Sequence, residues 1–268
     1  MKISQINIYP IKSLGGINLI DANVEVSGFQ YDRNWMLVDQ NGKFLTQRTL
    51  PEMALLQVAL EKDHLLVYHS LKTSERIKIP IDELSGEKIK SNVWDDAVTT
   101  MHVSAEVDKW FSSQLNVNCH LVKMDLENKR YIENKYSFNN EHVSFADSMP
   151  FLLIGQSSLD DLNSKLKEPL PMTRFRPNIV FTGGQAFAED DWKDIQIGQL
   201  RFRVTKPCAR CVMTTINQET GTKGKEPLKT LAQYRNVGGK ILFGQNLIAL
   251  DKGKIAVGEE IKPYSIPI

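Results

Sequence analysis

Short apolar runs that alternate with polar residues fill the chain from residue 1 to about Trp94, and turn residues separate these runs. Alternation with a period of two places successive side chains on opposite faces of an extended strand. The chain opens on such a run, at residues 1–9. We therefore predict antiparallel strands, and an all-β module, for this part of the chain.

Two hairpins are predicted inside this module. Asn41-Gly42 lies between the apolar runs 35–38 and 44–45, and this dipeptide favours a hairpin because both positions of its two-residue turn need positive φ. The runs 55–60 and 65–68 flank the polar residues 61–64 and predict the second hairpin.

Three segments have the spacing of helices. The first, 104–111, begins at Ser104, and the second begins at Ser157, which we expect to be its N-cap. The third follows Pro227, a residue suited to the first turn of a helix. The residues expected to face inward are Val107, Trp110 and Phe111, then Leu159, Leu162 and Leu166, then Leu228, Leu231 and Tyr234.

Further strands are predicted at 178–181, 200–204, 212–216 and 255–257, so the whole chain is expected to be β-rich with a few helices. Residues 125–140 are dense in Asn, Lys, Glu and Tyr and show no sustained period, which is typical of a loop. At 268 residues the chain is long enough for two domains. We place the border at this loop, with domains 1–124 and 125–268.

Charge and hydropathy exclude several kinds of partner. The formal net charge is +1, and no Lys/Arg block with interleaved aromatic residues suggests a nucleic-acid groove. No apolar run approaches the roughly 18 residues that span a bilayer, and the first residues do not resemble a signal peptide. We expect a cytoplasmic protein that binds neither nucleic acid nor membrane.

Cys208 and Cys211 form a CxxC pair beside Lys206 and Arg210, which would favour a thiolate. Three interpretations are open at this point. A zinc site lacks matching ligands, since Cys119 is the remaining cysteine and the histidines show no ligand pair. A thioredoxin-type dithiol requires a helix after the motif, where we predict a strand. Both cysteines could also be small core residues.

Three other polar clusters suggest an anionic ligand. Lys12 and Ser13 follow the first strand, and Arg33 precedes the first predicted hairpin. Arg174 and Arg176 precede the strand at 178–181, where their guanidinium groups could bind a phosphate or a planar heterocycle.

Together these segments resemble the MOSC family, whose domain is shared with the C-terminal part of molybdenum cofactor sulfurase, and within it the amidoxime-reducing group. The resemblance runs in the same order over nearly the whole chain. It is carried by Tyr9–Ser13, Asp32–Trp35, Phe145–Phe151, Phe175–Asn178 and Arg210–Thr215, followed by Lys225–Leu228. It implies an N-terminal β-barrel-like module, whose first strand and Lys12 could pack on the second domain, followed by a β-barrel MOSC domain with peripheral helices.

The resemblance also implies a site. Cys211, and not Cys208, falls on the cysteine that binds molybdenum in the family, and Asp147 falls on a loop near the metal, where we expect it to deliver protons. The positions expected to hold the molybdopterin and its phosphate are Lys12, Ser13, Arg33, Asp147, Ser148, Arg176, Asn178 and Arg210.

The implied activity is the two-electron reduction of small N-hydroxylated compounds such as amidoximes, hydroxylamines and N-hydroxylated bases. Some relatives carry a ferredoxin domain with an iron–sulfur cluster, which needs four thiolates. This chain has three cysteines, so we expect electrons from a separate ferredoxin-, flavodoxin- or cytochrome-type protein. Some relatives also have a membrane-anchoring segment, and some have a cysteine where Gly184 stands here. The resemblance therefore implies neither a membrane anchor nor that thiol for this chain.

Two other functions remain open from the residues. One is a non-catalytic carrier that binds the molybdenum cofactor, or sulfur on Cys211, and passes it on. The other is a β-rich binding protein without a metal.

Overall fold

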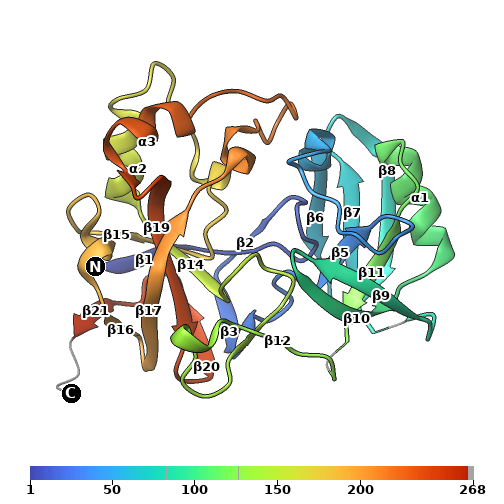
Figure 1. Cartoon of the computed structure of the whole chain (residues 1–268), viewed down its shortest axis with the longest axis horizontal. Helices are drawn as coiled ribbons and strands as arrows, with labels where there is room; N and C mark the ends of the chain where they lie inside the picture. Colours follow the sequence, from blue (N-terminus) through green and yellow to red (C-terminus); the bar gives the residue numbers. More distant parts are fainter. Residues whose placement is uncertain (83, 126, 265–268) are drawn as a thin grey trace.

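The computed structural model describes residues 1–82, 84–125 and 127–264 (Figure 1). Within these ranges several sheets are accompanied by three peripheral α-helices, namely α1 (Ala105–Leu115), α2 (Gln156–Asn163) and α3 (Leu228–Tyr234). The predicted β-rich fold with an N-terminal β-barrel-like module is confirmed. Among the helices of the described ranges, none combines the length and the apolar character needed to span a bilayer.

The largest sheet has nine strands in the order β2-β1-β15-β14-β19-β17-β16-β21, and β18 pairs with β19 outside this path. Its strands are β1 (Lys2–Ile8), β2 (Ile17–Leu19), β14 (Phe151–Gly155), β15 (Ile179–Thr182), β16 (Asp194–Ile197), β17 (Leu200–Ala209), β18 (Asn236–Val237), β19 (Lys240–Ala249) and β21 (Ile261–Tyr264). Strand β1 runs antiparallel to β15, with Ile6 opposite Ile179. The first strand of the chain thus lies in a sheet built mainly from residues after 150.

The remaining sheets are smaller, in the orders β5-β11-β10-β9, β6-β7-β8, β20-β3-β4 and β12-β13. Their strands are β3 (Asp21–Glu25), β4 (Gly28–Phe29), β5 (Trp35–Val38), β6 (Leu56–Leu60), β7 (His64–His69), β8 (Lys72–Pro80), β9 (Lys88–Val93), β10 (Asp96–His102), β11 (His120–Met124), β12 (Arg130–Tyr131), β13 (His142–Val143) and β20 (Gly253–Ala256). Short 3-10 helices lie at η1 (Pro51–Leu55), η2 (Asn134–Tyr136), η3 (Met172–Arg174), η4 (Ala188–Asp191) and η5 (Val212–Thr215).

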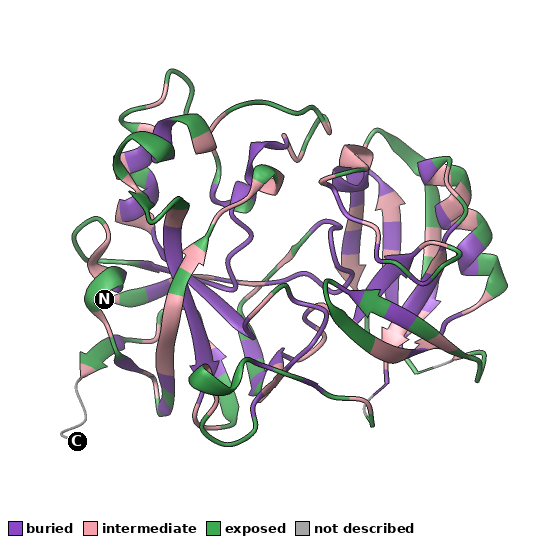
Figure 2. Cartoon of the chain, in the orientation of Figure 1, coloured by how far each residue is buried: buried purple, intermediate pink, exposed green. Residues whose placement is uncertain are grey.

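Five apolar clusters lie among the described residues, and the two largest hold the large sheet and the N-terminal sheets. Along β3 and β7 buried residues alternate with more exposed ones, as expected for strands with one covered face. In the large sheet Phe151 packs edge to face against Phe29 and Phe202. In the N-terminal part Trp35 of β5 and Phe111 of α1 are fully buried in one apolar cluster. Figure 2 shows the buried residues concentrated on the strands of both parts. Loops at the strand ends are therefore held on a rigid framework.

Helix α1 begins where the sequence predicts. The Ser104 hydroxyl accepts a hydrogen bond from the Val107 amide, which satisfies one of the free N–H groups of the first turn. Asn116 ends the helix with φ 50°, in the left-handed region that Asn tolerates. Val107 and Phe111 are buried as expected, and the helix continues to Leu115, four residues past the predicted segment.

The first predicted hairpin is confirmed, but its two-residue turn is wrong. Its arms pair antiparallel: Val38 bridges Phe44, the Asp39 amide donates to the Lys43 carbonyl, and the Leu45 amide donates to the Leu37 carbonyl. Of Asn41 and Gly42, Gly42 alone takes a positive φ, at 76°, and its N–H donates to the Asp39 carbonyl, so the turn is longer than two residues. Strand β5 also pairs with β11. The second hairpin is confirmed as β6 and β7.

Three local predictions are also wrong. Residues 212–215 form η5 and not a strand, because the Thr214 and Thr215 hydroxyls donate to the carbonyls three residues earlier and favour a tight turn. Ser157 does not cap α2; its hydroxyl donates to the Gly184 carbonyl, and Gly155 is the N-cap. Tyr234 does not face inward, since it is 37% exposed.

Candidate functional site

A cavity of about 480 Å³ brings together residues from positions 12 to 246. Every predicted site residue lines it, and Cys208 lies in the same wall. These predicted residues are Lys12, Ser13, Arg33, Asp147, Ser148, Arg176, Asn178, Arg210 and Cys211. The cavity is the candidate functional site.

The segment that follows β1 runs beside the segment that precedes β5, and this contact forms one wall. The Lys12 amide donates to the Trp35 carbonyl at 2.8 Å, and the Arg33 amide donates to the Tyr9 carbonyl at 3.0 Å. The backbone links therefore hold the Lys12 and Arg33 side chains on the same side of the fold.

Three cavity residues have left-handed backbone conformations: Ser13 with φ 67°, Arg33 with φ 52° and Arg176 with φ 54°. Such a conformation costs a residue other than Gly about 1–3 kcal/mol and concentrates at functional sites. The surrounding contacts hold these residues in place; for example, Gln47 donates to the Ser13 carbonyl at 2.7 Å. The strain is a reason to regard this wall as functional.

Asp32 organises a buried hydrogen-bond network behind the wall. Its carboxylate accepts from the Tyr9 amide at 2.7 Å, from the Asn178 amide group at 3.1 Å, and from Arg33. Asn178 also donates to the Asn7 carbonyl and accepts from the Leu152 amide and from Arg33. The Asn178 side chain is thus fully engaged by protein atoms, and its role is to position Arg33.

The Tyr9 ring is covered by two guanidinium groups, with the Arg176 group 4.1 Å and the Arg33 group 4.4 Å from the ring centre. Burial raises the pKa of Tyr9 to about 12, and burial also lowers the pKa of Arg176 to about 10. Arg176 donates to the Leu14 carbonyl at 2.6 Å. Two buried cations stacked on one ring create a positive region beside the cavity.

Asp147 lies between two cations. Lys12 ion-pairs with its Oδ1 atom, and Arg48 donates to its Oδ2 atom at 2.8 Å. Loss of part of its hydration would raise the pKa of Asp147, but the side chain is still 47% exposed, and Lys12 and Arg48 hold this pKa well below its usual range. Burial lowers the pKa of Lys12 against the opposing effect of Asp147. Asp147 is therefore a carboxylate at neutral pH and a poor proton donor.

The two cysteines of the CxxC pair have different surroundings. Cys208 lies near the end of β17 and accepts a 3.0 Å hydrogen bond from Arg210. Cys211 lies after the strand, directly before η5, and the Arg48 guanidinium is close enough to interact with it. Lys206 instead pairs with Glu133 at 2.8 Å. Arg210 thus lies beside Cys208, as inferred for the pair, whereas Lys206 does not serve it and the cation that interacts with Cys211 is Arg48.

Arg48 is the main cavity residue that sequence reasoning missed. Burial opposes its charge, but Asp147 and then Cys211 outweigh burial and raise the pKa of Arg48. Its guanidinium also covers the Trp94 ring at 4.7 Å. The sequence offers only a weak signal, the polar run Thr46–Thr49 after an apolar pair, because contact with Asp147 spans 99 positions.

The charge of the cavity lining suits an anionic group. Among the described residues Asp147 is the single carboxylate in the lining. Arg210 Nε is buried without a hydrogen-bond partner in the described part of the chain, which leaves one donor free for a ligand. The basic residues of the lining are Lys12, Arg33, Arg48, Arg174, Arg176, Lys206, Arg210 and Lys240. A phosphate-bearing cofactor with a metal that binds thiolate would fit this set of donors.

Comparison with known proteins gives two family matches that together span most of the chain. The model of the MOSC N-terminal beta barrel domain matches residues 1–118, and the model of the MOSC domain matches residues 140–262.

Three similar proteins illustrate the range of relatives. Molybdenum cofactor sulfurase of Arabidopsis thaliana is 32% identical over 97% of this chain, which spans 35% of that protein's length. Mitochondrial amidoxime-reducing component 1 of Mus musculus is 31% identical over 97% of this chain and 81% of its own length. The crystal structure of the YUAD protein from Bacillus subtilis is 10% identical, with a TM-score of 0.44 over 97% of this chain and 93% of that one.

Proposed function

Since this chain belongs to the MOSC family, with a MOSC N-terminal domain before the MOSC domain, we propose that it binds a molybdenum cofactor around Cys211 and reduces N-hydroxylated compounds. The observation that carries the proposal is the cavity that unites the Cys211 thiol with a strongly basic lining. The amidoxime-reducing relative supports the reaction class, because the chain spans 81% of that protein. We keep 1–124 and 125–268 as the proposed domains.

The proposed role of each residue follows from its partners. Cys211 would supply the thiolate ligand, and Arg48 would stabilise its negative charge. Arg176 and Arg210 would bind the phosphate, with Arg210 Nε as the free donor, while Ser13 and Ser148 could bond polar edges of the pterin. Asn178 would act indirectly, by holding Arg33.

The reduction of an N–OH group takes two electrons and two protons and releases water and the N–H compound. When bound, the cofactor would supply the two-electron oxygen chemistry that side chains lack. A proton donor works best with a pKa near the working pH. Because Asp147 is held as a carboxylate and the pKa of Lys12 is lowered, we propose that Lys12 gives up the proton and that Asp147 orients it.

The chain needs an electron source, and we propose a separate ferredoxin-, flavodoxin- or cytochrome-type protein. The substrate class would be small amidoximes, hydroxylamines or N-hydroxylated bases. The 480 Å³ cavity is of the size that holds small molecules.

The test is to purify the protein from a host that makes the cofactor, and to measure molybdenum per chain and turnover of a model amidoxime with an artificial electron donor. Stoichiometric molybdenum with turnover is expected. Cys211→Ser should abolish turnover, whereas the matched variant Cys208→Ser should retain most of it. Equal losses in the two variants would contradict the assignment of Cys211 as the single ligand.

A second candidate function is a non-catalytic carrier of the cofactor or of sulfur. It is favoured by the similarity to molybdenum cofactor sulfurase, of which this chain spans 35%. Molybdenum binding without turnover of any N-hydroxylated compound would support the carrier. Absence of molybdenum after expression in a competent host would contradict the reductase and the cofactor carrier, and would leave only the sulfur carrier of these candidates.

A further inference from the structure

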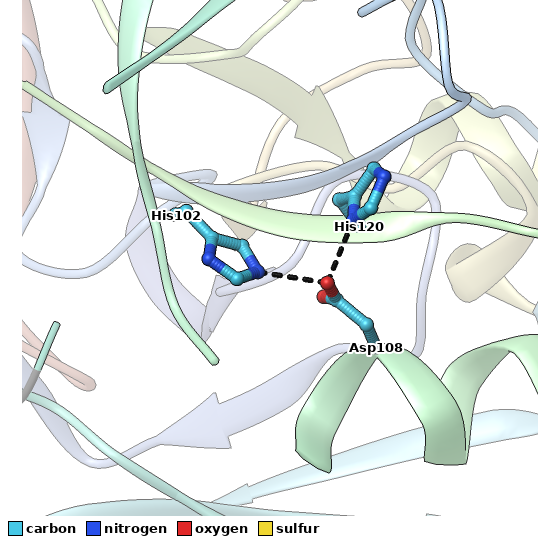
Figure 3. A group of neighbouring side chains, drawn as sticks. All are labelled: His102, Asp108 and His120. Atoms are coloured by element: carbon cyan, nitrogen blue, oxygen red, sulfur yellow. Dashed lines mark hydrogen bonds and ion pairs between the residues drawn. The ribbon is translucent and has the colours of Figure 1, made fainter. Parts of the chain in front are cut away.

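The end of β10, the first turn of α1 and the start of β11 bring two histidines and one aspartate together, outside the cavity (Figure 3). His102 Nε2 and His120 Nδ1 each lie 2.7 Å from the same oxygen, Asp108 Oδ2. The three ligand atoms lie within 4.8 Å of one another. We propose that this cluster, His102–Asp108–His120, binds a zinc ion.

The fold holds the cluster in a defined shape. Strands β10 and β11 pair antiparallel with His102 opposite Val122, and the backbone link from Val103 to Leu121 continues this register. Asp108 Oδ1 accepts a 2.8 Å hydrogen bond from the Leu121 amide. That bond fixes the carboxylate and turns Oδ2 toward both imidazoles, as Figure 3 shows.

The donor set selects the kind of ion. Two imidazole nitrogens with one carboxylate oxygen suit Zn²⁺, whereas Ca²⁺ and Mg²⁺ prefer sites made of oxygen ligands alone. Three protein ligands leave the fourth tetrahedral position to water. His120 is 41% exposed and borders a shallow groove with Gln40 and Asn118, through which water and the ion can enter.

The groups behind His102 favour the tautomer that a metal needs. Its Nδ1 atom lies 3.1 Å from the Ser85 hydroxyl and 3.7 Å from a Glu87 carboxylate oxygen, which can only accept a hydrogen bond. With a proton on Nδ1, the Nε2 atom would offer its lone pair to a metal ion, which would replace the present 2.7 Å contact between Nε2 and Asp108 Oδ2. A ligand histidine that donates its second N–H to an oxygen is the usual arrangement in zinc sites.

The neighbouring cysteine is not part of the site. Cys119 is buried, and its sulfur contacts the Ser112 hydroxyl. None of His102, Asp108 and His120 lines the large cavity. Zinc here would join α1 to the β10–β11 pair, independently of the proposed molybdenum site, so either proposal can fail without the other.

The experiment uses the full-length Cys208→Ser/Cys211→Ser protein, because thiolates of the CxxC pair could bind zinc themselves. Metal is removed with a chelator, and ZnCl₂ is added in competition with a chromogenic chelator. One equivalent of zinc should bind, and zinc should raise the melting temperature, since a ligand that binds only the folded state stabilises it. Bound Co²⁺ should give the visible absorption of a tetrahedral site.

Variants test the ligands. His102→Ala and His120→Ala should each weaken zinc binding by more than about a hundredfold, and Ser85→Ala by about tenfold because it only orients His102. His64→Ala is the matched control, since His64 pairs with Asp63 alone, and it should bind zinc as the parent does. Circular dichroism of each metal-free variant checks folding.

Two outcomes would overturn the site. If the Cys208→Ser/Cys211→Ser protein binds no zinc and gives no Co²⁺ absorption, the cluster is a hydrogen-bond network with a shared proton. This result does not depend on whether the histidine variants fold. If zinc binds but the His102 and His120 variants bind it as tightly as His64→Ala does, the ion lies elsewhere.

Discussion

The Arg48 guanidinium donates a 2.8 Å hydrogen bond to the Asp147 carboxylate, although 99 positions separate the two residues. The same guanidinium interacts with the Cys211 thiol. Arg48 therefore links the loop after β13 to the segment after β17, and it balances the negative charge of Asp147.

Arg48→Ala should weaken retention of the molybdenum cofactor by about tenfold or more, because the site loses a charge-assisted partner. Arg48→Lys should restore part of the retention, since it keeps the charge and loses the planar fork. Molybdenum per chain after gel filtration measures the effect. Arg76→Ala, at an exposed position of β8, is the control; if it lost as much metal, Arg48 would have no specific role.

Asp147 should make the stability of the metal-free protein depend on pH. Its pKa is lower in the folded state than in the unfolded chain, where it is about 3.9. The carboxylate thus stabilises the fold above that pH, and the stabilisation is lost as the pH falls through the folded value. The difference in unfolding free energy between the parent and Asp147→Asn should narrow from pH 7 to pH 3, as measured with urea.

The control for this comparison is Asp95→Asn, which removes an exposed carboxylate that has no ion pair within the described ranges. The difference in unfolding free energy between the parent and Asp95→Asn should stay nearly constant from pH 7 to pH 3. If it narrowed as much as the difference for Asp147→Asn, the effect would come from the net charge and not from the contacts of Asp147 with Lys12 and Arg48.

Asn178→Ala should destabilise the fold by about 2 kcal/mol or more, because it leaves one hydrogen bond of the buried Asp32 carboxylate and the Leu152 amide unmade. Urea unfolding of the metal-free protein measures this loss. Asn139→Ala, at an exposed position, should change the unfolding free energy by less than about 0.5 kcal/mol. Similar values for both variants would show that the network around Asp32 contributes little.

Cys119 should resist alkylation in the native protein. It is 2% exposed, and burial raises the pKa of its thiol to about 11, so little reactive thiolate forms at pH 8. Cys208 and Cys211 are half-buried and should react first in the metal-free protein. Mass spectrometry of peptides after iodoacetamide treatment, with and without urea, gives the order; early labelling of Cys119 would contradict the structure.

A fragment of residues 125–268 should not fold alone. Strand β1 pairs with β15 and buries Ile3, Ile6 and Ile8 in the core of the large sheet. Without it, β15 exposes an unpaired edge and apolar surface, which favours aggregation. Solubility and heteronuclear NMR of the fragment test this, and the full chain is the control. A soluble fragment with dispersed amide resonances would show that β1 is dispensable.

Local patterns were sufficient where a structure depends on neighbours in the chain. The apolar runs 55–60 and 65–68 around the polar residues 61–64 predicted the β6–β7 hairpin, and Ser104 predicted the start of α1, because apolar patterning and capping are local properties. The segments with Lys12, Arg33, Arg176 and Cys211 could also be identified, since each carries its own motif.

Where short-range and long-range contacts compete, local patterns failed. The Ser157 hydroxyl bonded the Gly184 carbonyl across the fold and did not cap the helix. Propensities favour such local structures by about 1 kcal/mol, and tertiary contacts readily outweigh them.

By itself, the sequence determined the family, the β-rich class and nine of the residues that line the cavity, because these follow from residue types and their order. Only the tertiary structure decided that Arg48 lies at Cys211, that Asn178 serves Asp32 and Arg33, and that two histidines share Asp108. Sheet pairing and helix packing bring the residues of these contacts together from distant parts of the chain. The strength of an ion pair or hydrogen bond between them depends on their distance in space, not on their positions in the chain.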